Sequence, residues 1–163
     1  RFGLEPSLDK LRQWEESYWY NVQSNTRVFP EVTDVLNTLT AQHGPLGLIT
    51  NTQGQSNTGT HRITNYPELA AMFAATIVAG ENEIPTKPDP RPFALCLELL
   101  GVLAEQAVYV GDDWRIDICG SRNAGLKPVW LKHHTVKRNY PEVDVDVPII
   151  TSLNELASCL ETL

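Results

Sequence analysis

Short, continuous runs of hydrophobic residues alternate along the chain with stretches in which hydrophobic positions recur every three to four residues. Most of the short runs are followed by Gly or Thr and lack regular polar alternation, which is typical of strands buried on both faces. The periodic stretches indicate amphipathic helices. The pattern predicts strands at 46–50, 75–79, 106–110, 127–131 and 147–150, and helices at 4–20, from 32 to the turn at 43–45, at 92–100, at 116–124 and at 152–163.

Strands that alternate with helices indicate a parallel sheet, because each right-handed crossover lays a helix across one face of the sheet. We therefore expect an α/β fold in a three-layer α/β/α arrangement, with an irregular surface loop over 132–146. In such sheets, ligands bind just beyond the carboxyl ends of the strands. The residues that follow each strand are therefore the first candidates for chemistry.

Composition narrows the class of protein. The 163 residues are 42% hydrophobic and 20% charged, and no hydrophobic run approaches the roughly 20 residues of a membrane helix. The net charge of −7 argues against a broad basic surface for nucleic acid. Three scattered cysteines, Cys96, Cys119 and Cys159, and the lack of a secretory signal after Arg1 favour a cytoplasmic protein with free thiols.

The acidic junction after the strand at 106–110 is the richest in candidate chemistry. Asp112, Asp113 and Asp117 fall within six residues, and carboxylates this close repel one another unless a cation lies among them. Oxygen ligands of this kind suit Mg²⁺, and Gly111 would let the backbone approach that ion. The same acidic residues would equally suit the first turn of a helix, where negative charge is favoured.

Two other junctions carry side chains that suit a phosphate group. Thr50 and Asn51 follow the first predicted strand and can donate hydrogen bonds to phosphate oxygens, although a plain Asx or Ser/Thr turn also explains the pair. Lys87 lies in the proline-rich segment 85–90, whose stiff backbone would hold the ammonium beside a phosphate and a carboxylate. A solvated lysine in a turn is the alternative for this residue.

In chain order the junctions are Thr50-Asn51 after a strand, then Lys87-Pro88 before a helix, then Gly-Asp-Asp-x-x-x-Asp at 111–117 after a later strand. Taken in that order, they resemble the haloacid dehalogenase (HAD) superfamily of hydrolases. The similarity runs from about Phe29 to Leu163 and includes residues 87–92 and the stretch VGDDWRIDICGSRNAGLKPVWL. The resemblance implies a Rossmann-like sheet, dependence on Mg²⁺, and most often hydrolysis of a phosphate ester through an aspartyl-phosphate intermediate.

The resemblance also implies roles for individual residues. Thr50 and Asn51 would bind the transferred phosphoryl group together with Lys87. Lys87 would in addition act catalytically, because it would orient the nucleophile and offset negative charge in the transition state.

A second set of implied roles concerns the metal ion. Asp112 would ligate Mg²⁺, and Asp117 or Asp113 would hold the same ion directly or through a water molecule. Mg²⁺ is therefore the expected cofactor, and a small phosphorylated metabolite is the expected partner.

The chain departs from the family's pattern at its beginning. The family's defining motif is a strand that ends in Asp-x-Asp, the nucleophile followed by the general acid and base, and it precedes everything found here. The sequence has one Asp-x-Asp, at 144–146, which follows a polar loop and is interpreted as a surface pair. We expect residues 1–28 to be the end of a helical cap domain, residues 29–163 to be a core without its first strand, and the sheet to have a gap between 106–110 and 46–50.

The sequence leaves two functions open. The first is a Mg²⁺-dependent phosphatase whose nucleophilic Asp lies outside this chain, so that the 163 residues alone are inactive. The second is an inactive phosphate-binding and Mg²⁺-binding or regulatory module. The joint presence of Thr50, Lys87 and Asp112 favours the first, and the complete acidic cluster disfavours a dehalogenase. We expect no nucleic acid and no membrane as partners, and the sequence determines neither the substrate nor the oligomeric state.

Overall fold

Five parallel strands form the centre of the molecule. The computed structural model describes residues 5–52, 62–143 and 146–163. Its strands are hydrogen-bonded in two ladders, one that joins β1 to β2 and one in which β4 lies between β3 and β5. The strands are β1 (Gly47–Asn51), β2 (Ala75–Ala79), β3 (Val108–Gly111), β4 (Lys127–Leu131) and β5 (Ile149–Ile150).

Helices connect these strands and form the outer layers. The α-helices are α1 (Leu8–Asn25), α2 (Val32–His43), α3 (Pro67–Ala70), α4 (Arg91–Leu100), α5 (Gly120–Asn123) and α6 (Leu156–Leu160). Short 3₁₀ segments lie at Arg62–Asn65, Ala104–Gln106 and Leu153–Glu155, and Trp114–Cys119 is π-helical.

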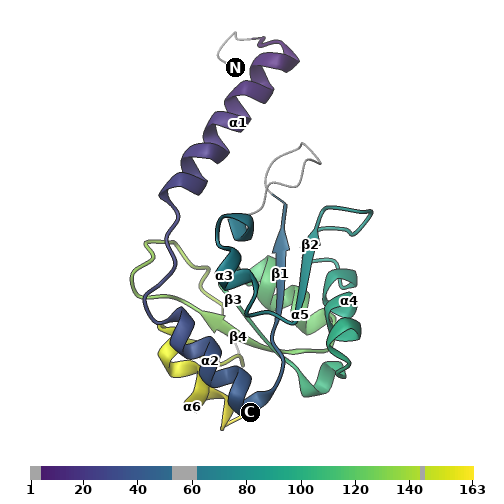
Figure 1. Ribbon diagram of the computed structural model, residues 1–163, viewed down its shortest axis with the longest axis vertical. Coiled ribbons are helices and arrows are strands. Elements are labelled where there is room, and N and C mark those ends of the chain that lie inside the picture. The colour runs from purple at the N-terminus through teal and green to yellow at the C-terminus, as the bar shows by residue number, and fades with distance from the viewer. Residues whose placement is uncertain (1–4, 53–61, 144–145) are drawn as a thin grey trace.

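Two hydrophobic clusters cover opposite faces of the sheet. One cluster includes Phe93 of α4, against which Tyr109 of β3 packs. The other includes Leu39 of α2 and Leu156 of α6, and the next residue of β3, Val110, packs there. Successive residues of one strand thus point to opposite faces, and α2 and α6 lie on the side of the sheet away from α4 and α5 (Figure 1). The predicted three-layer α/β/α fold with a Rossmann-like parallel sheet is confirmed.

The sheet is interrupted between its two ladders. Among the described strands, no ladder joins β1 to β3. This matches the gap that the sequence predicts between 46–50 and 106–110. The two neighbouring edges each carry backbone groups without a strand partner.

The predicted boundaries hold best for the buried strands and least well for the helices. β2 and β4 have the predicted limits, and β1 is shifted by one residue. The helix predicted at 4–20 runs instead from Leu8 to Asn25, because its polar last turns contain neither Gly nor Pro and continue without hydrophobic periodicity. The predicted tail is wrong in extent, since the strand at 147–150 is reduced to β5 and the helix at 152–163 to a 3₁₀ turn and α6.

The helix predicted at 116–124 begins earlier and is wider than an α-helix. Its first six residues, Trp114–Cys119, are π-helical. The Asp113 carbonyl accepts hydrogen bonds from the N–H groups of both Asp117 and Ile118, at 2.9 and 3.1 Å. The second of these closes an i to i+5 turn, which a periodicity of 3.6 does not predict.

Helix α1 projects away from the rest of the molecule (Figure 1). Several of its large side chains are exposed by half or more: Leu8 (74%), Trp14 (50%), Tyr18 (60%) and Tyr20 (72%). Within the described parts of the chain, we find no helix with the length and hydrophobicity needed to cross a bilayer.

Candidate active site

Lys87 lies at the interrupted edge of the sheet, where its ammonium group joins three separate segments. Nζ donates to the Ile49 carbonyl of β1 at 3.1 Å, to the Tyr109 hydroxyl of β3 at 2.8 Å, and to Oδ1 of Asp117 at 2.7 Å. The lysine side chain is only 9% exposed. An ammonium group has three hydrogens, and these three acceptors within the protein match them in number. The solvated lysine considered as an alternative is excluded.

The Ile49 carbonyl is available to Lys87 because it points away from β2. The Leu46 carbonyl accepts from Ala74 N–H, and Thr52 N–H donates to the Ala79 carbonyl, so even-numbered residues of β1 face β2. Backbone groups alternate along a strand, which directs those of Ile49 toward β3. Lys87 therefore fills a hydrogen-bonding position on an edge that pairs with none of the described strands.

Asn51, at the end of β1, holds the backbone of Lys87. Its Oδ1 accepts from Lys87 N–H at 2.9 Å, and its Nδ2 donates to the Lys87 carbonyl at 3.2 Å. The amide predicted to bind phosphate is thus engaged with the Lys87 loop. Among the residues that the structure describes, the hydroxyl of Thr50 makes one hydrogen bond, a long contact of 3.5 Å with the Asn51 carbonyl, so it is the better placed of the two to receive a ligand.

Asp117 forms a buried ion pair with Lys87. Its side chain is 8% exposed, and its Oδ2 also accepts from Asp113 N–H at 3.0 Å. A Cβ at Gly111 would lie 2.3 Å from Cβ of Asp117. Gly111 therefore makes room for this side chain, rather than for a metal ion as the sequence suggested. Burial, and then the charge of Asp117, raise the pKa of the Tyr109 hydroxyl well above its ordinary value.

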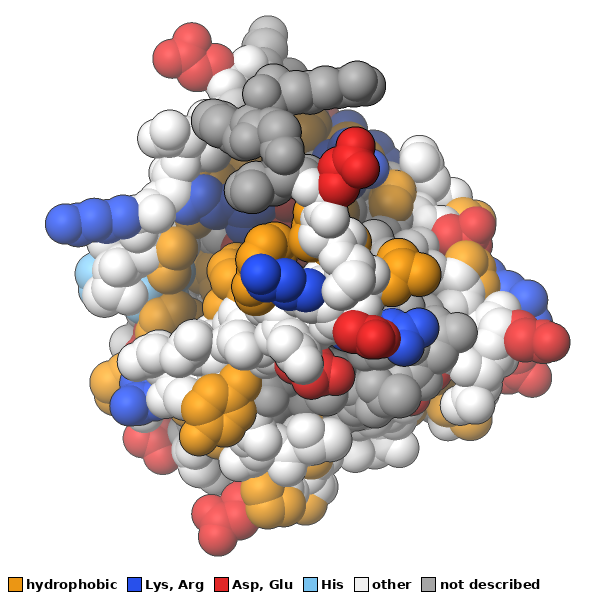
Figure 2. All heavy atoms as spheres, turned by 90° about the horizontal axis from the view of Figure 1, so that it is seen from above, with side chains coloured by type: hydrophobic (Ala, Val, Ile, Leu, Met, Phe, Trp, Pro, Cys, Tyr) orange, Lys and Arg blue, Asp and Glu red, His pale blue; other side chains and the backbone are white. Residues whose placement is uncertain are grey.

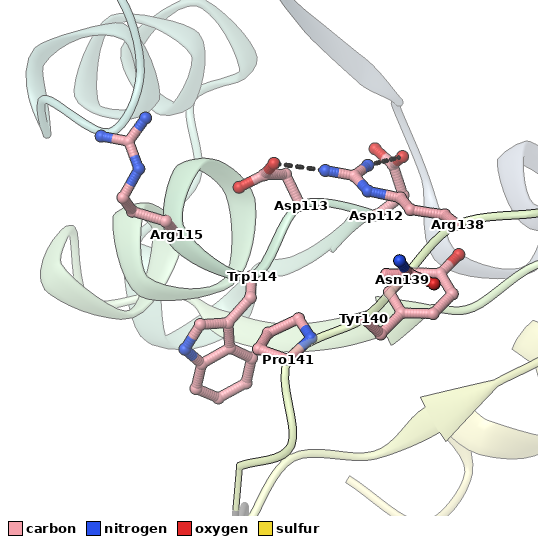
Figure 3. Close-up of a pocket in the computed structure, with 8 residues that line it drawn as sticks. All are labelled: Asp112, Asp113, Trp114, Arg115, Arg138, Asn139, Tyr140 and Pro141. Atoms are coloured by element: carbon pink, nitrogen blue, oxygen red, sulfur yellow. Dashed lines mark hydrogen bonds and ion pairs between the residues drawn. The ribbon is translucent and has the colours of Figure 1, made fainter.

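Asp112 and Asp113 face a different cation, the guanidinium of Arg138 (Figure 3). Its Nη1 and Nη2 each lie 2.5 Å from one oxygen of Asp112 and Asp113, respectively. Asp113 also caps the π-helical turn, since its Oδ1 accepts from Ile116 N–H at 2.8 Å. Burial acts to raise the pKa of Asp113, but the hydrogen bonds from Ile116 and Arg138 outweigh it and lower that pKa.

An open pocket of about 330 Å³ lies beside this ion-pair cluster. Figure 3 shows Arg138 between the two carboxylates, whereas Arg115 points away from them. The lining residues are Asp112, Asp113, Trp114, Arg115, Arg138, Asn139, Tyr140 and Pro141. The loop predicted as irregular surface thus supplies half of a pocket at the acidic junction.

The acidic residues fit a divalent cation in part. Asp112 and Asp113 place two carboxylates around one positive charge, which is the donor chemistry that Mg²⁺ prefers. Both oxygens of Asp117 are already engaged, by Lys87 and by Asp113 N–H. In the described residues, no three His, Cys, Asp or Glu side chains gather in a metal-binding cluster. A full coordination shell would therefore need oxygens from water or from outside this chain.

Two residues of this site were not predicted from the sequence. Tyr109 is the one residue in the apolar run 106–110 with a hydroxyl group, and it lies directly before Val110 and Gly111 at the end of that run. A hydroxyl group at the end of a buried strand is the signal from which Tyr109 could be identified as a site residue. Arg138 offers no comparable signal, because it comes from a loop 25 residues beyond Asp113. The Asp-x-Asp at 144–146 falls partly outside the described residues.

The end of the molecule seen in Figure 2 carries acidic, basic and hydrophobic side chains interspersed. On this face, no single sign of charge dominates.

A scan against protein-family models matches residues 4–131 to the haloacid dehalogenase-like hydrolases. Among curated proteins, the phosphoglycolate phosphatase of Escherichia coli (strain K12) is 32% identical over 160 residues, covering 96% of this chain and 60% of that protein. The chain thus spans about 60% of the length of this relative.

Solved structures agree on the fold. Magnesium-bound YfnB from Bacillus subtilis matches with a TM-score of 0.72 and 26% identity, over 98% of this chain and 66% of the other. A 2-haloacid dehalogenase from Pseudomonas syringae matches with a TM-score of 0.69 and 26% identity, over 96% of this chain and 64% of the other.

Proposed function

Because the chain belongs to the haloacid dehalogenase-like hydrolases, we propose that it forms part of a Mg²⁺-dependent phosphatase for a small phosphate ester. The observation that carries the proposal is the convergence of Asn51, Tyr109 and Asp117 on Lys87. A buried ammonium beside the end of a strand suits the negative charge of a phosphoryl group. The phosphoglycolate phosphatase relative supports a small, anionic phosphate ester as the substrate.

In the proposed reaction, side chains of this chain bind, orient and neutralise the phosphoryl group. The Thr50 hydroxyl would donate to a phosphoryl oxygen, and Asn51 would keep the Lys87 loop in place beside it. Each hydrogen of Lys87 already has an acceptor. Its contribution is therefore a positive charge held at a fixed point, which stabilises the transition state electrostatically without reorganisation.

Asp112 and Asp113 would hold the metal ion of the proposed reaction. When bound, Mg²⁺ supplies positive charge that offsets the charge of the phosphoryl oxygens. Arg138 would have to leave both carboxylates for the ion to bind. Asp117 would help to position Asp113, because its carboxylate accepts a hydrogen bond from Asp113 N–H and so fixes the backbone of that residue.

The nucleophile and the general acid of the proposed reaction would come from outside these 163 residues. Covalent phosphoryl transfer needs a carboxylate in line with phosphorus and a group that protonates the leaving oxygen. Asp112, Asp113 and Asp117 are held by cations. The interruption between β1 and β3 supports a further strand at that position, ending beside Lys87 and carrying both groups.

We also propose that residues 1–28 are the end of a helical cap domain and that residues 29–163 are the catalytic core. The support for this division is that α1 projects from the core (Figure 1). Three of the aromatic side chains of α1 are also exposed. Trp14, Tyr18 and Tyr20 would then pack within the cap or against the substrate.

The test is a phosphatase assay with p-nitrophenyl phosphate and Mg²⁺, on the protein made from the complete reading frame and on the 163-residue chain. We expect hydrolysis by the complete protein, loss of activity with EDTA, and no turnover by the 163-residue chain. Asp112→Asn in the complete protein should lower kcat at least 100-fold, because one metal ligand is weakened. Robust hydrolysis by the short chain, dependent on Asp112, would show that the nucleophile has been misplaced.

The same experiment separates the phosphatase from an inactive binding module. Asp112 and Lys87 would serve either function, but only a phosphatase turns over its ligand. If the complete protein binds Mg²⁺ and inorganic phosphate by calorimetry yet hydrolyses no phosphate ester, the regulatory module is the correct function.

A further inference from the structure

Tyr109 supplies one of the three acceptors that fix the Lys87 ammonium, and no family role assigned above involves it. Its hydroxyl oxygen lies 2.8 Å from Nζ of Lys87 and 3.4 Å from Oδ1 of Asp117. We infer that Tyr109 is a positioning residue for Lys87 in phosphoryl transfer, an inference that rests on the proposed function. It accepts a hydrogen bond from the ammonium, which also donates to the Ile49 carbonyl of β1, and so helps to fix the position of the positive charge.

The Tyr109 hydroxyl can fill this role because packing against a buried side chain restricts its ring. The ring lies edge-on to Phe93 of α4, with 4.9 Å between centroids and 72° between planes. Phe93 is fully buried, and Tyr109 packs against the same hydrophobic cluster. Ring packing therefore contributes to the position of the hydroxyl in addition to its polar partners.

The Tyr109 hydroxyl also bridges the two charged groups beside it, the ammonium of Lys87 and the carboxylate of Asp117. A neutral phenol has one hydrogen to donate and lone pairs to accept with. Lys87 donates to the oxygen, and the phenol's own hydrogen is directed at Asp117. Lys87, Asp117 and Tyr109 thus form a closed triangle, and the Ile49 carbonyl holds the ammonium from outside it. Three acceptors in different directions define the position of Nζ, whereas two acceptors would allow the ammonium group to rotate away from the site.

Removing only the Tyr109 hydroxyl oxygen should therefore alter the position of the Lys87 ammonium and leave the fold unchanged. Tyr109→Phe keeps the ring contact with Phe93 and leaves one ammonium hydrogen of Lys87 without an acceptor. The substrate contact at Thr50 remains, so ground-state binding is preserved. We expect a loss in kcat with little change in KM, which is the signature of an interaction that acts in the transition state.

The experiment compares Tyr109→Phe with Tyr66→Phe in the complete protein, using p-nitrophenyl phosphate and Mg²⁺. Tyr66 is a matched control, because its hydroxyl also makes a 2.8 Å hydrogen bond, to the Thr26 carbonyl outside the site. We expect Tyr109→Phe to lower kcat about tenfold or more, the scale of a hydrogen bond to a charged group, with KM within about twofold. Tyr66→Phe should change neither value. Equal kcat values for the two variants would overturn the inference.

A second measurement follows Lys87 without any turnover. Brief acetylation of the 163-residue chain with acetic anhydride, read by peptide mass spectrometry, reports how firmly the ammonium is held. We expect faster labelling at Lys87 in Tyr109→Phe than in Tyr66→Phe, and equal labelling at Lys127. Equal labelling of Lys87 in both variants would overturn the inference. Absence of hydrolysis by the unaltered complete protein would instead overturn the proposed function, and the labelling then decides separately whether Tyr109 holds the ammonium.

Discussion

Replacing Lys87 by Met tests the central contact of the site, because it removes a charge and keeps most of the side-chain length. The lysine and aspartate side chains of the Lys87–Asp117 pair are 9% and 8% exposed. Without the ammonium, the carboxylate would retain, among its described partners, the 3.0 Å hydrogen bond from Asp113 N–H and the 3.4 Å contact with Tyr109. Breaking a buried pair from one side costs about 3–5 kcal/mol, since an uncompensated charge stays buried.

That loss is large against the stability of a single domain, about 5–15 kcal/mol. We expect Lys87→Met to lower the free energy of unfolding by about 3–5 kcal/mol in urea titrations followed by tryptophan fluorescence. Its Tm should fall by about 6–20 °C, at roughly 2–4 °C per kcal/mol for a domain of this size. Adding Asp117→Asn in the same chain should restore about 1–3 kcal/mol, because the second change removes the unpaired charge.

An exposed pair in the same chain provides the control. Arg12 and Asp9 lie 4.0 Å apart, with side chains that are 73% and 87% exposed. Arg12→Met should change the free energy of unfolding by less than about 0.5 kcal/mol, because water screens such pairs. If Lys87→Met costs no more than this control, or if its cost simply adds to that of Asp117→Asn, the buried ion pair does not exist as described.

Three further predictions concern the acidic junction. Arg138→Ala should tighten Mg²⁺ binding to the 163-residue chain about 5- to 30-fold in calorimetry, because two partly exposed ion pairs of about 0.5–1 kcal/mol each no longer compete; unchanged or weaker binding would contradict this. Asp113→Asn should be less stable than the unaltered chain at pH 6, and the difference should vanish as pH falls below the ordinary carboxyl value of 3.8, because the lowered pKa of Asp113 stabilises the fold only while the carboxylate is ionised; a constant difference down to pH 2 would refute it. Gly111→Ala should cost about 1–3 kcal/mol in the same urea titration, since its Cβ would overlap Asp117; a neutral result would mean that Asp117 lies elsewhere.

The order and type of the main elements follow from local patterning. The runs at 75–79 and 127–131 become β2 and β4 with the predicted limits, because strands covered on both faces are mostly apolar and stand out from the polar segments around them. The junctions after β1 and β3 were found from the same pattern, since polar residues resume where a buried strand ends. The interruption beside β1 was also foreseen, although from the family resemblance and not from any residue in the chain.

Partners across the site could not be predicted in the same way. Lys87 meets Asp117 across 30 residues, and Asn51 binds the backbone of Lys87 across 36. Periodicity records which side chains are buried, but it carries no information on which of them face one another. Arg138 is the clearest case, because a basic residue in an irregular loop resembles any solvated side chain until the loop folds back over two carboxylates. Distance along the chain hides such contacts, and only the folding of residues 138–141 beside residues 112–115 brings the charges within reach.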